Sequence, residues 1–184
     1  MNKRFFSISV AIIMAVSVTN SYAQNPIKTA EGNNLNVDAN GVMAQGYDVV
    51  EMHLHPDQTI KGDAQFQSSY AGAKYYFSTE ANKQLFDTDP AKYAPAFGGY
   101  CAIAAAQHNL RPVQVWTHTI ANGQLVFNHN ARALGLWQKN VRKNFKSATK
   151  NWPTLNNNAP SYNILKPGET QETLAASSYE SEKK

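Results

Sequence analysis

The alternation of apolar and polar positions predicts a chain of short elements. Aromatic residues crowd Tyr75–Phe77, as in a half-buried strand, and a helix over about Thr79–Thr88 follows directly, with apolar residues at helical spacing. Asp89 and Pro90 suit the N-cap and first position of a second short helix, which Pro95 ends. This stretch therefore predicts a strand followed by two short helices.

A second apolar run lies upstream, at residues 49–52, and its β-branched residues favour an early strand. His53 and His55 follow at its end, before Pro56, which stops regular strand pairing. In an extended segment both imidazoles would point to the same side, so that a single metal ion could bind both.

Downstream, Gly98 and Gly99 predict a tight turn that leads Cys101 into the small apolar segment Ala102–Ala106. Asn122-Gly123 is a strong hairpin signal between two runs rich in β-branched and aromatic residues. Pairing outward from that turn would place six side chains on one face: Trp116, His118, Ile120, Leu125, Phe127 and His129.

Apolar residues then recur every three or four positions from Ala131 to about Lys150, which predicts one long helix ended by Trp152-Pro153. The expected fold class is α+β: a small antiparallel sheet with short helices and a longer C-terminal helix. From residue 156 to 184 the chain is polar, with few large apolar residues, and this composition predicts a disordered tail.

Several short motifs follow one another along the chain: G-Y-D at 46–48, F-S-x-E-x-N-x-x-x-F at 77–86, D-P-x-K-Y-A-P at 89–95, G-G-Y-C-A at 98–102 and N-W-P at 151–153. In this order they resemble the motifs of the YHS domain family. The resemblance spans residues 46–155 and implies a metal-binding module, with copper as the usual ion. The chain departs from the family where His53, His118 and His129 occupy positions at which the family has aromatic rings.

The N-terminus has the pattern of a secretory signal peptide. Lys3 and Arg4 precede an apolar core, and Ser21 and Ala23 are the small residues that a signal peptidase reads. We expect cleavage after Ala23, a polar lead-in over residues 24–45, a periplasmic location and no stable membrane anchor after cleavage.

The charge of the mature chain excludes some partners. Loss of Lys3 and Arg4 leaves 15 basic residues against 13 acidic ones, a net charge of +2. This is too small to predict binding to nucleic acid or to anionic lipid. The densest basic cluster, Lys139 to Lys150, is typical of a solvated helix face.

The single cysteine and the histidines are the candidate metal ligands. Cys101 has no partner for an internal disulfide, so it is a buried inert residue, a ligand or a reactive thiol. Imidazole suits copper and zinc, and thiolate suits Cu(I) and zinc. The predicted ligand set is Cys101, His53, His55, His118 and His129, for copper first and zinc second, in metal handling or buffering.

Two other functions stay open at this point. An enzyme is the less favoured one, because the chain has no C-x-x-C, nucleophile elbow or phosphate-binding loop. The other is an interaction module whose aromatic hairpin face, with Tyr70, Tyr75, Trp116 and Phe127, docks a periplasmic protein or a small apolar ligand.

Overall fold

The structure is a computed structural model that describes residues 34–38 and 40–157. The predicted signal peptide, half of the lead-in and most of the tail lie outside these residues. The elements in chain order are η1 (Ala44–Gly46), α1 (Val49–Leu54), β1 (Asp63–Tyr70), β2 (Ala73–Phe77), α2 (Glu80–Thr88), α3 (Pro90–Tyr93), η2 (Phe97–Gly99), α4 (Ala102–Ala106), β3 (Gln114–Ala121), β4 (Gln124–Asn128), α5 (Ala131–Gln138) and α6 (Val141–Asn157).

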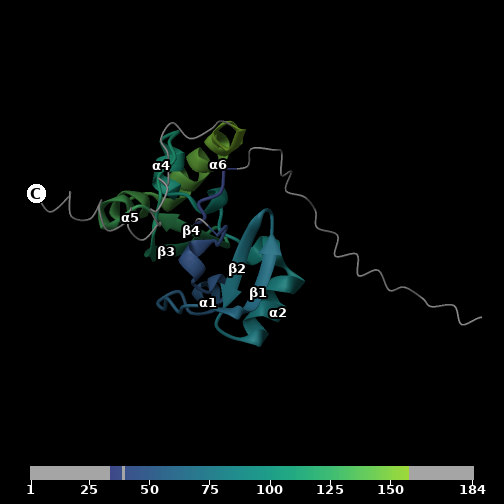
Figure 1. Ribbon diagram of the computed structural model, residues 1–184. Helices are drawn as coiled ribbons and strands as arrows, with labels where there is room; N and C mark the ends of the chain where they lie inside the picture. The colour runs from purple at the N-terminus through teal and green to yellow at the C-terminus, as the bar shows by residue number, and fades with distance from the viewer. Residues whose placement is uncertain (1–33, 39, 158–184) are drawn as a thin grey trace, which may run out of the picture.

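The predicted α+β class is confirmed, although the strands form two separate antiparallel hairpins. β1–β2 lies with α1 and α2 at one end of the molecule, α4, α5 and α6 lie at the other, and β3–β4 lies between them (Figure 1). None of the helices in the described residues is long and apolar enough to cross a membrane.

The central helices form where the pattern predicts them. The Thr79 side chain accepts a hydrogen bond from the Asn82 N–H and so caps α2. Asp89 caps α3 in the same way, with Pro90 in the first turn. Phe86 anchors α2 in the core, where it packs against Tyr75 and Phe77 with ring centroids 4.6 and 5.0 Å apart.

The early strand predicted at residues 49–52 is wrong, because this segment is helix α1. Asp48 precedes it as an N-cap whose carboxylate accepts hydrogen bonds from the N–H groups of Val50 and Glu51. These bonds satisfy donors that an isolated first turn leaves free, and Val50 and Met52 are fully buried on the helix. The cap and the tertiary packing outweigh the strand preference of the β-branched residues.

The C-terminal helix is two helices instead of one. α5 ends at Gln138, and the Asn140 side chain accepts a hydrogen bond from the Lys143 N–H in the first turn of α6. α6 then continues past Pro153, the residue that was expected to end it. Trp152, on α6, packs against Phe97 with the ring centroids 6.0 Å apart.

The turn at Gly98-Gly99 is confirmed, and the packing explains both glycines. Each has a positive φ, 57° at Gly98 and 78° at Gly99. A Cβ on Gly98 would lie 2.2 Å from the Asn34 carbonyl oxygen, and one on Gly99 would lie 2.6 Å from the Met43 sulfur. No larger side chain fits without displacing its neighbours.

Candidate functional site

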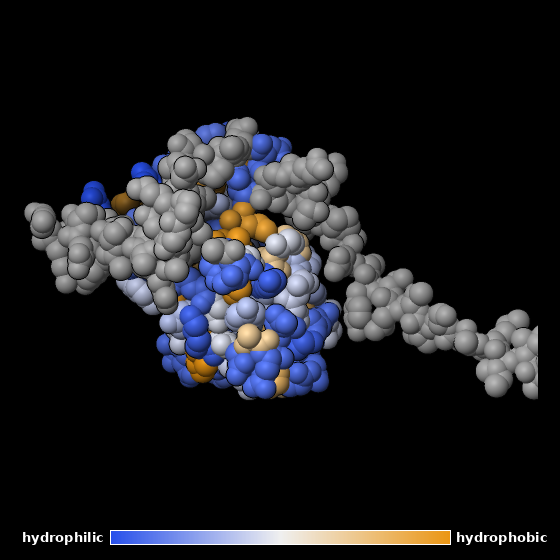
Figure 2. All heavy atoms as spheres, viewed as in Figure 1, coloured by the Kyte–Doolittle hydropathy of each residue, from blue (hydrophilic) through white to orange (hydrophobic). Residues whose placement is uncertain are grey.

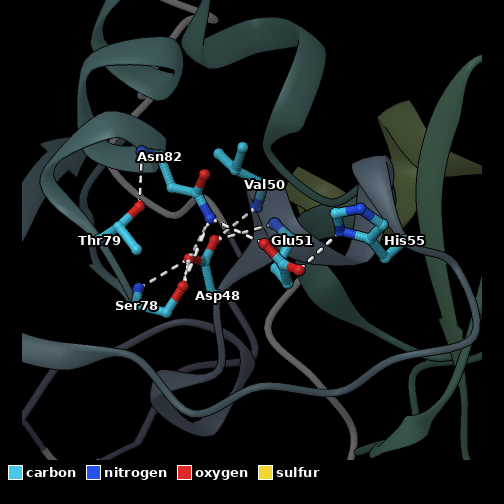
Figure 3. A network of polar contacts seen from close by, with 7 residues as sticks. All are labelled: Asp48, Val50, Glu51, His55, Ser78, Thr79 and Asn82. Atoms are coloured by element: carbon cyan, nitrogen blue, oxygen red, sulfur yellow. Dashed lines mark hydrogen bonds and ion pairs between the residues drawn. The ribbon is translucent and has the colours of Figure 1, made fainter.

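The Asp48 carboxylate is the centre of the densest polar network near the candidate ligands (Figure 3). It is fully buried. Besides the two N–H groups of α1, it accepts hydrogen bonds from the Ser78 N–H at 2.7 Å, the Ser78 hydroxyl at 2.8 Å and the Asn82 amide at 2.8 Å. These bonds join α1 to the start of α2. Asp48 therefore has a structural role at the backbone turn that begins α1.

His53 lies on α1, and His55 is the residue that caps its C-terminus in a non-helical conformation. Because the segment is not an extended strand, the expected common side of the two imidazoles is wrong. The His53 ring packs edge-on against Tyr93 at 5.2 Å, and its Nδ1 lies 3.0 Å from the Val49 carbonyl. His55 is exposed and pairs through Nδ1 with the Glu51 carboxylate at 2.6 Å.

The hairpin face predicted around His118 is only partly present. Ile120 pairs with Leu125 as expected, but the register shifts between Gln114 and Thr119. The irregularity is bridged by a side chain, because the Asn128 N–H donates to the Thr117 hydroxyl at 2.8 Å in place of a strand carbonyl. The expected pairing of Trp116 with His129 is therefore wrong.

This bulge also separates the aromatic residues that were expected to form one surface. Trp116 is 49% exposed, whereas Phe127 is 1% exposed and belongs to the core. Side chains on the two sides of a bulge no longer follow simple alternation. The hairpin offers no continuous aromatic docking face within the described residues.

Three of the histidines share one arrangement of the imidazole. Nδ1 lies against a backbone carbonyl in each: Val49 for His53, Val115 at 3.2 Å for His118, and Pro112 at 2.8 Å for His129. Because a carbonyl only accepts, Nδ1 must carry the hydrogen, and Nε2 keeps the lone pair in the neutral ring. Metal-binding histidines are commonly oriented by such a bond.

The Nε2 atoms of His53 and His118 are buried without a hydrogen-bond partner among the described residues. Burial lowers the pKa of both imidazoles, against the smaller raising effect of nearby carbonyls. Both rings are therefore neutral near pH 7. A neutral ring with a free Nε2 is the form that binds copper or zinc.

Cys101 is 1% exposed, and burial raises the pKa of its thiol. Its Sγ lies 3.8 Å from the Asn128 side-chain oxygen, to which the S–H can donate. The surroundings thus stabilise the protonated thiol, which suits a buried residue better than a thiolate ligand.

The family comparison matches residues 50–97 to the model of the YHS domain. The chain contains a YHS domain. The matched stretch includes His53 and His55 but ends before Cys101, His118 and His129. Comparisons with curated proteins and with solved structures found no significant match.

The YHS domain is associated with metal binding, so the donor set can be tested against such a role. The free Nε2 atoms of His53 and His118 fit a metal-binding role. Among the described residues, however, no three His, Cys, Asp or Glu side chains lie together as a ready metal site. The structure gives His53 and His55 different partners and keeps Cys101 in the core, and the roles of all five as ligands stay predictions.

The sequence reasoning missed the partners of Asp48. Ser78 and Asn82 stand in the F-S-x-E-x-N motif, which predicts a helix start and contributes to the family resemblance but does not reveal their bonds to Asp48. The sequence alone did not show that this helix start faces the N-terminus of α1 30 residues upstream.

Proposed function

We propose that this protein is an exported YHS-domain protein that binds a metal ion, copper first and zinc second, and serves in metal handling or buffering. The observation that carries the proposal is the pair of buried, neutral imidazoles, His53 and His118, whose Nε2 atoms have no hydrogen-bond partner in the described part of the chain. A buried polar atom without a partner costs about 1–3 kcal/mol, so its presence calls for an explanation.

Both rings lie at the contact between α1 and the β3–β4 hairpin. His53, on α1, is close enough to the Gly123 carbonyl in the hairpin turn for that carbonyl to affect the pKa of the ring. His118, on β3, is affected in the same way by the Pro56 carbonyl, just after α1. The contact between the end of α1 and the hairpin is therefore where we propose that the ion binds.

The other three predicted ligands are less suited to bind the ion. His129 is the next candidate, because the Pro112 carbonyl holds its Nδ1 and so directs Nε2 toward other groups. His55 is engaged with Glu51, and Cys101 would first have to lose a proton in an apolar setting. Export rests on the signal-peptide pattern of residues 1–23, which predicts a mature N-terminus at Gln24 in the periplasm.

The test is a titration of the mature chain, residues 24–184 without a histidine tag, with Cu(I), Cu(II) and Zn(II) against a competing chelator. We expect one equivalent of copper to bind, and His53→Gln or His118→Gln to weaken binding at least tenfold. His108→Gln is the matched control, because His108 is an exposed histidine in a turn.

Copper binding no tighter than that of an exposed histidine would refute the proposal. Binding that both histidine variants keep but Cys101→Ala loses would move the site to the thiol. Export is tested separately, by cell fractionation and by the mass of the mature N-terminus.

A further inference from the structure

A pocket of about 400 Å³ lies between the β1–β2 turn and α6, and none of the proposed metal ligands lines it. Tyr70 and Tyr75 line it on the hairpin side, Trp152 on the α6 side, and Phe97 in the connecting segment. Figure 2 shows apolar surface, in orange, between the upper and lower parts of the molecule. The volume is within the range of small-molecule sites, about 300–1,000 Å³.

The two tyrosines supply polar groups that the protein itself leaves unused. Tyr75 is 3% exposed and Tyr70 is 8% exposed, and among the described residues no side chain or backbone group hydrogen-bonds either hydroxyl. Neither hydroxyl oxygen is among the fully buried unpaired atoms, so both can face the open space of the cavity that the two side chains line. Burial raises the pKa of both tyrosines, and the neighbouring Tyr70 hydroxyl adds to the rise at Tyr75, as Asp89 does at Tyr70. Tyrosine hydroxyls commonly pair with a partner, and an occupant of the cavity could supply one.

The lining limits the chemistry of an occupant. None of the described residues that line the pocket carries a charge, so a charged ligand would lose its hydration without compensation. The aromatic rings of Tyr75, Phe97 and Trp152 favour stacked or edge contacts with another ring. Two protonated hydroxyls are donors for an acceptor oxygen.

We propose that this pocket binds a neutral, ring-bearing, mainly apolar molecule whose carbonyl or hydroxyl oxygen accepts hydrogen bonds from Tyr70 and Tyr75. The site is separate from the proposed metal site, and neither proposal depends on the other. It also replaces the aromatic hairpin face as the place where a small apolar ligand would bind.

The test uses the mature chain, residues 24–184, with a chelator present to exclude metal effects. Prodan, a neutral naphthyl ketone whose fluorescence reports an apolar environment, is the probe. We expect saturable binding, displacement by acetylnaphthalene, and about three- to tenfold weaker displacement by ethylnaphthalene, which lacks the carbonyl. The anion naphthoate should displace prodan more weakly than acetylnaphthalene does.

The variant Tyr75→Phe should reduce the preference for acetylnaphthalene over ethylnaphthalene, because one of the two donors is lost. Tyr76→Phe is the matched control, since Tyr76 is the next residue on β2 and does not line the pocket. Amide chemical-shift changes on adding acetylnaphthalene should concentrate at residues 70–75, 94–98 and 149–156.

Three results would overturn the proposal: no saturable prodan signal, equal displacement by the two naphthalenes in the parent protein, or shift changes centred elsewhere. A segment of the chain itself is the competing occupant, because Leu35 and Asn156 line the pocket. Occupancy by such a segment would exclude prodan from the mature chain and would count against the proposal.

Discussion

Asp48→Asn should strongly destabilise the domain, although it removes only a charge and exchanges one oxygen for an NH₂ group. Oδ1 accepts from two backbone N–H groups, and Oδ2 accepts from the Ser78 N–H, the Ser78 hydroxyl and the Asn82 amide. An asparagine can keep its oxygen toward the group of three donors. Its NH₂ then faces the N–H groups of Val50 and Glu51, donor against donor.

The magnitude follows from those two lost acceptor contacts. A buried donor left without an acceptor costs about 1–3 kcal/mol, so two give about 2–6 kcal/mol. Small domains have a free energy of unfolding of about 5–15 kcal/mol, so the loss is a large fraction of the total. Urea unfolding followed by circular dichroism and tryptophan fluorescence measures it directly.

The matched control is Asp57→Asn, at an exposed aspartate after α1, which should change the free energy of unfolding by less than about 0.5 kcal/mol. An Asp48→Asn protein within about 1 kcal/mol of the parent would refute the reasoning. It would mean that water or a rearranged α1 satisfies the two N–H groups.

Three other predictions follow from single positions. Gly98→Ala should lower the free energy of unfolding by at least about 2 kcal/mol, because its Cβ would meet the Asn34 carbonyl oxygen at 2.2 Å. Gly123→Ala is the control, because its Cβ would have no atom within 4 Å, and it should lower the free energy of unfolding by only about 1 kcal/mol. The Cys101 thiol is 1% exposed and has a raised pKa. It should therefore react with Ellman's reagent on the order of a hundredfold more slowly in the native protein than in urea, and comparable rates would show that the thiol is accessible. The pKa of His118 is lowered from 6.5 in the folded state, so the unfolded state binds a proton first as pH falls below about 6.5, and the metal-free protein should lose stability there. Urea unfolding should show a smaller loss of stability between pH 7.5 and 5.5 for His118→Gln than for the parent protein. An unchanged loss would exclude this histidine as a cause.

Local signals predicted the parts of the fold that depend on neighbours in the chain. The helix that begins after Thr79, the Asp89 cap and the turn at Asn122-Gly123 all formed as expected. Each needs only a side chain and backbone groups a few residues apart, which the sequence displays directly.

Local reasoning failed where two conformations were close in energy. Residues 49–52 suit a strand by composition, but the Asp48 cap and two fully buried side chains make them helical. The Thr117 hydroxyl likewise replaces a strand carbonyl and shifts the hairpin register, so Trp116 and Phe127 differ in exposure. Such outcomes depend on packing that propensity does not describe.

By itself, the sequence determined the fold class, the order of most elements and the inventory of candidate ligands, since these follow from residue type and short-range spacing. Only the tertiary structure decided that Asp48 joins two helices, that His53 and His55 have different partners, and that Tyr70, Tyr75 and Trp152 line one pocket. The physical reason is that convergence of side chains from distant segments depends on how whole elements pack, and periodicity along the chain carries no record of that packing.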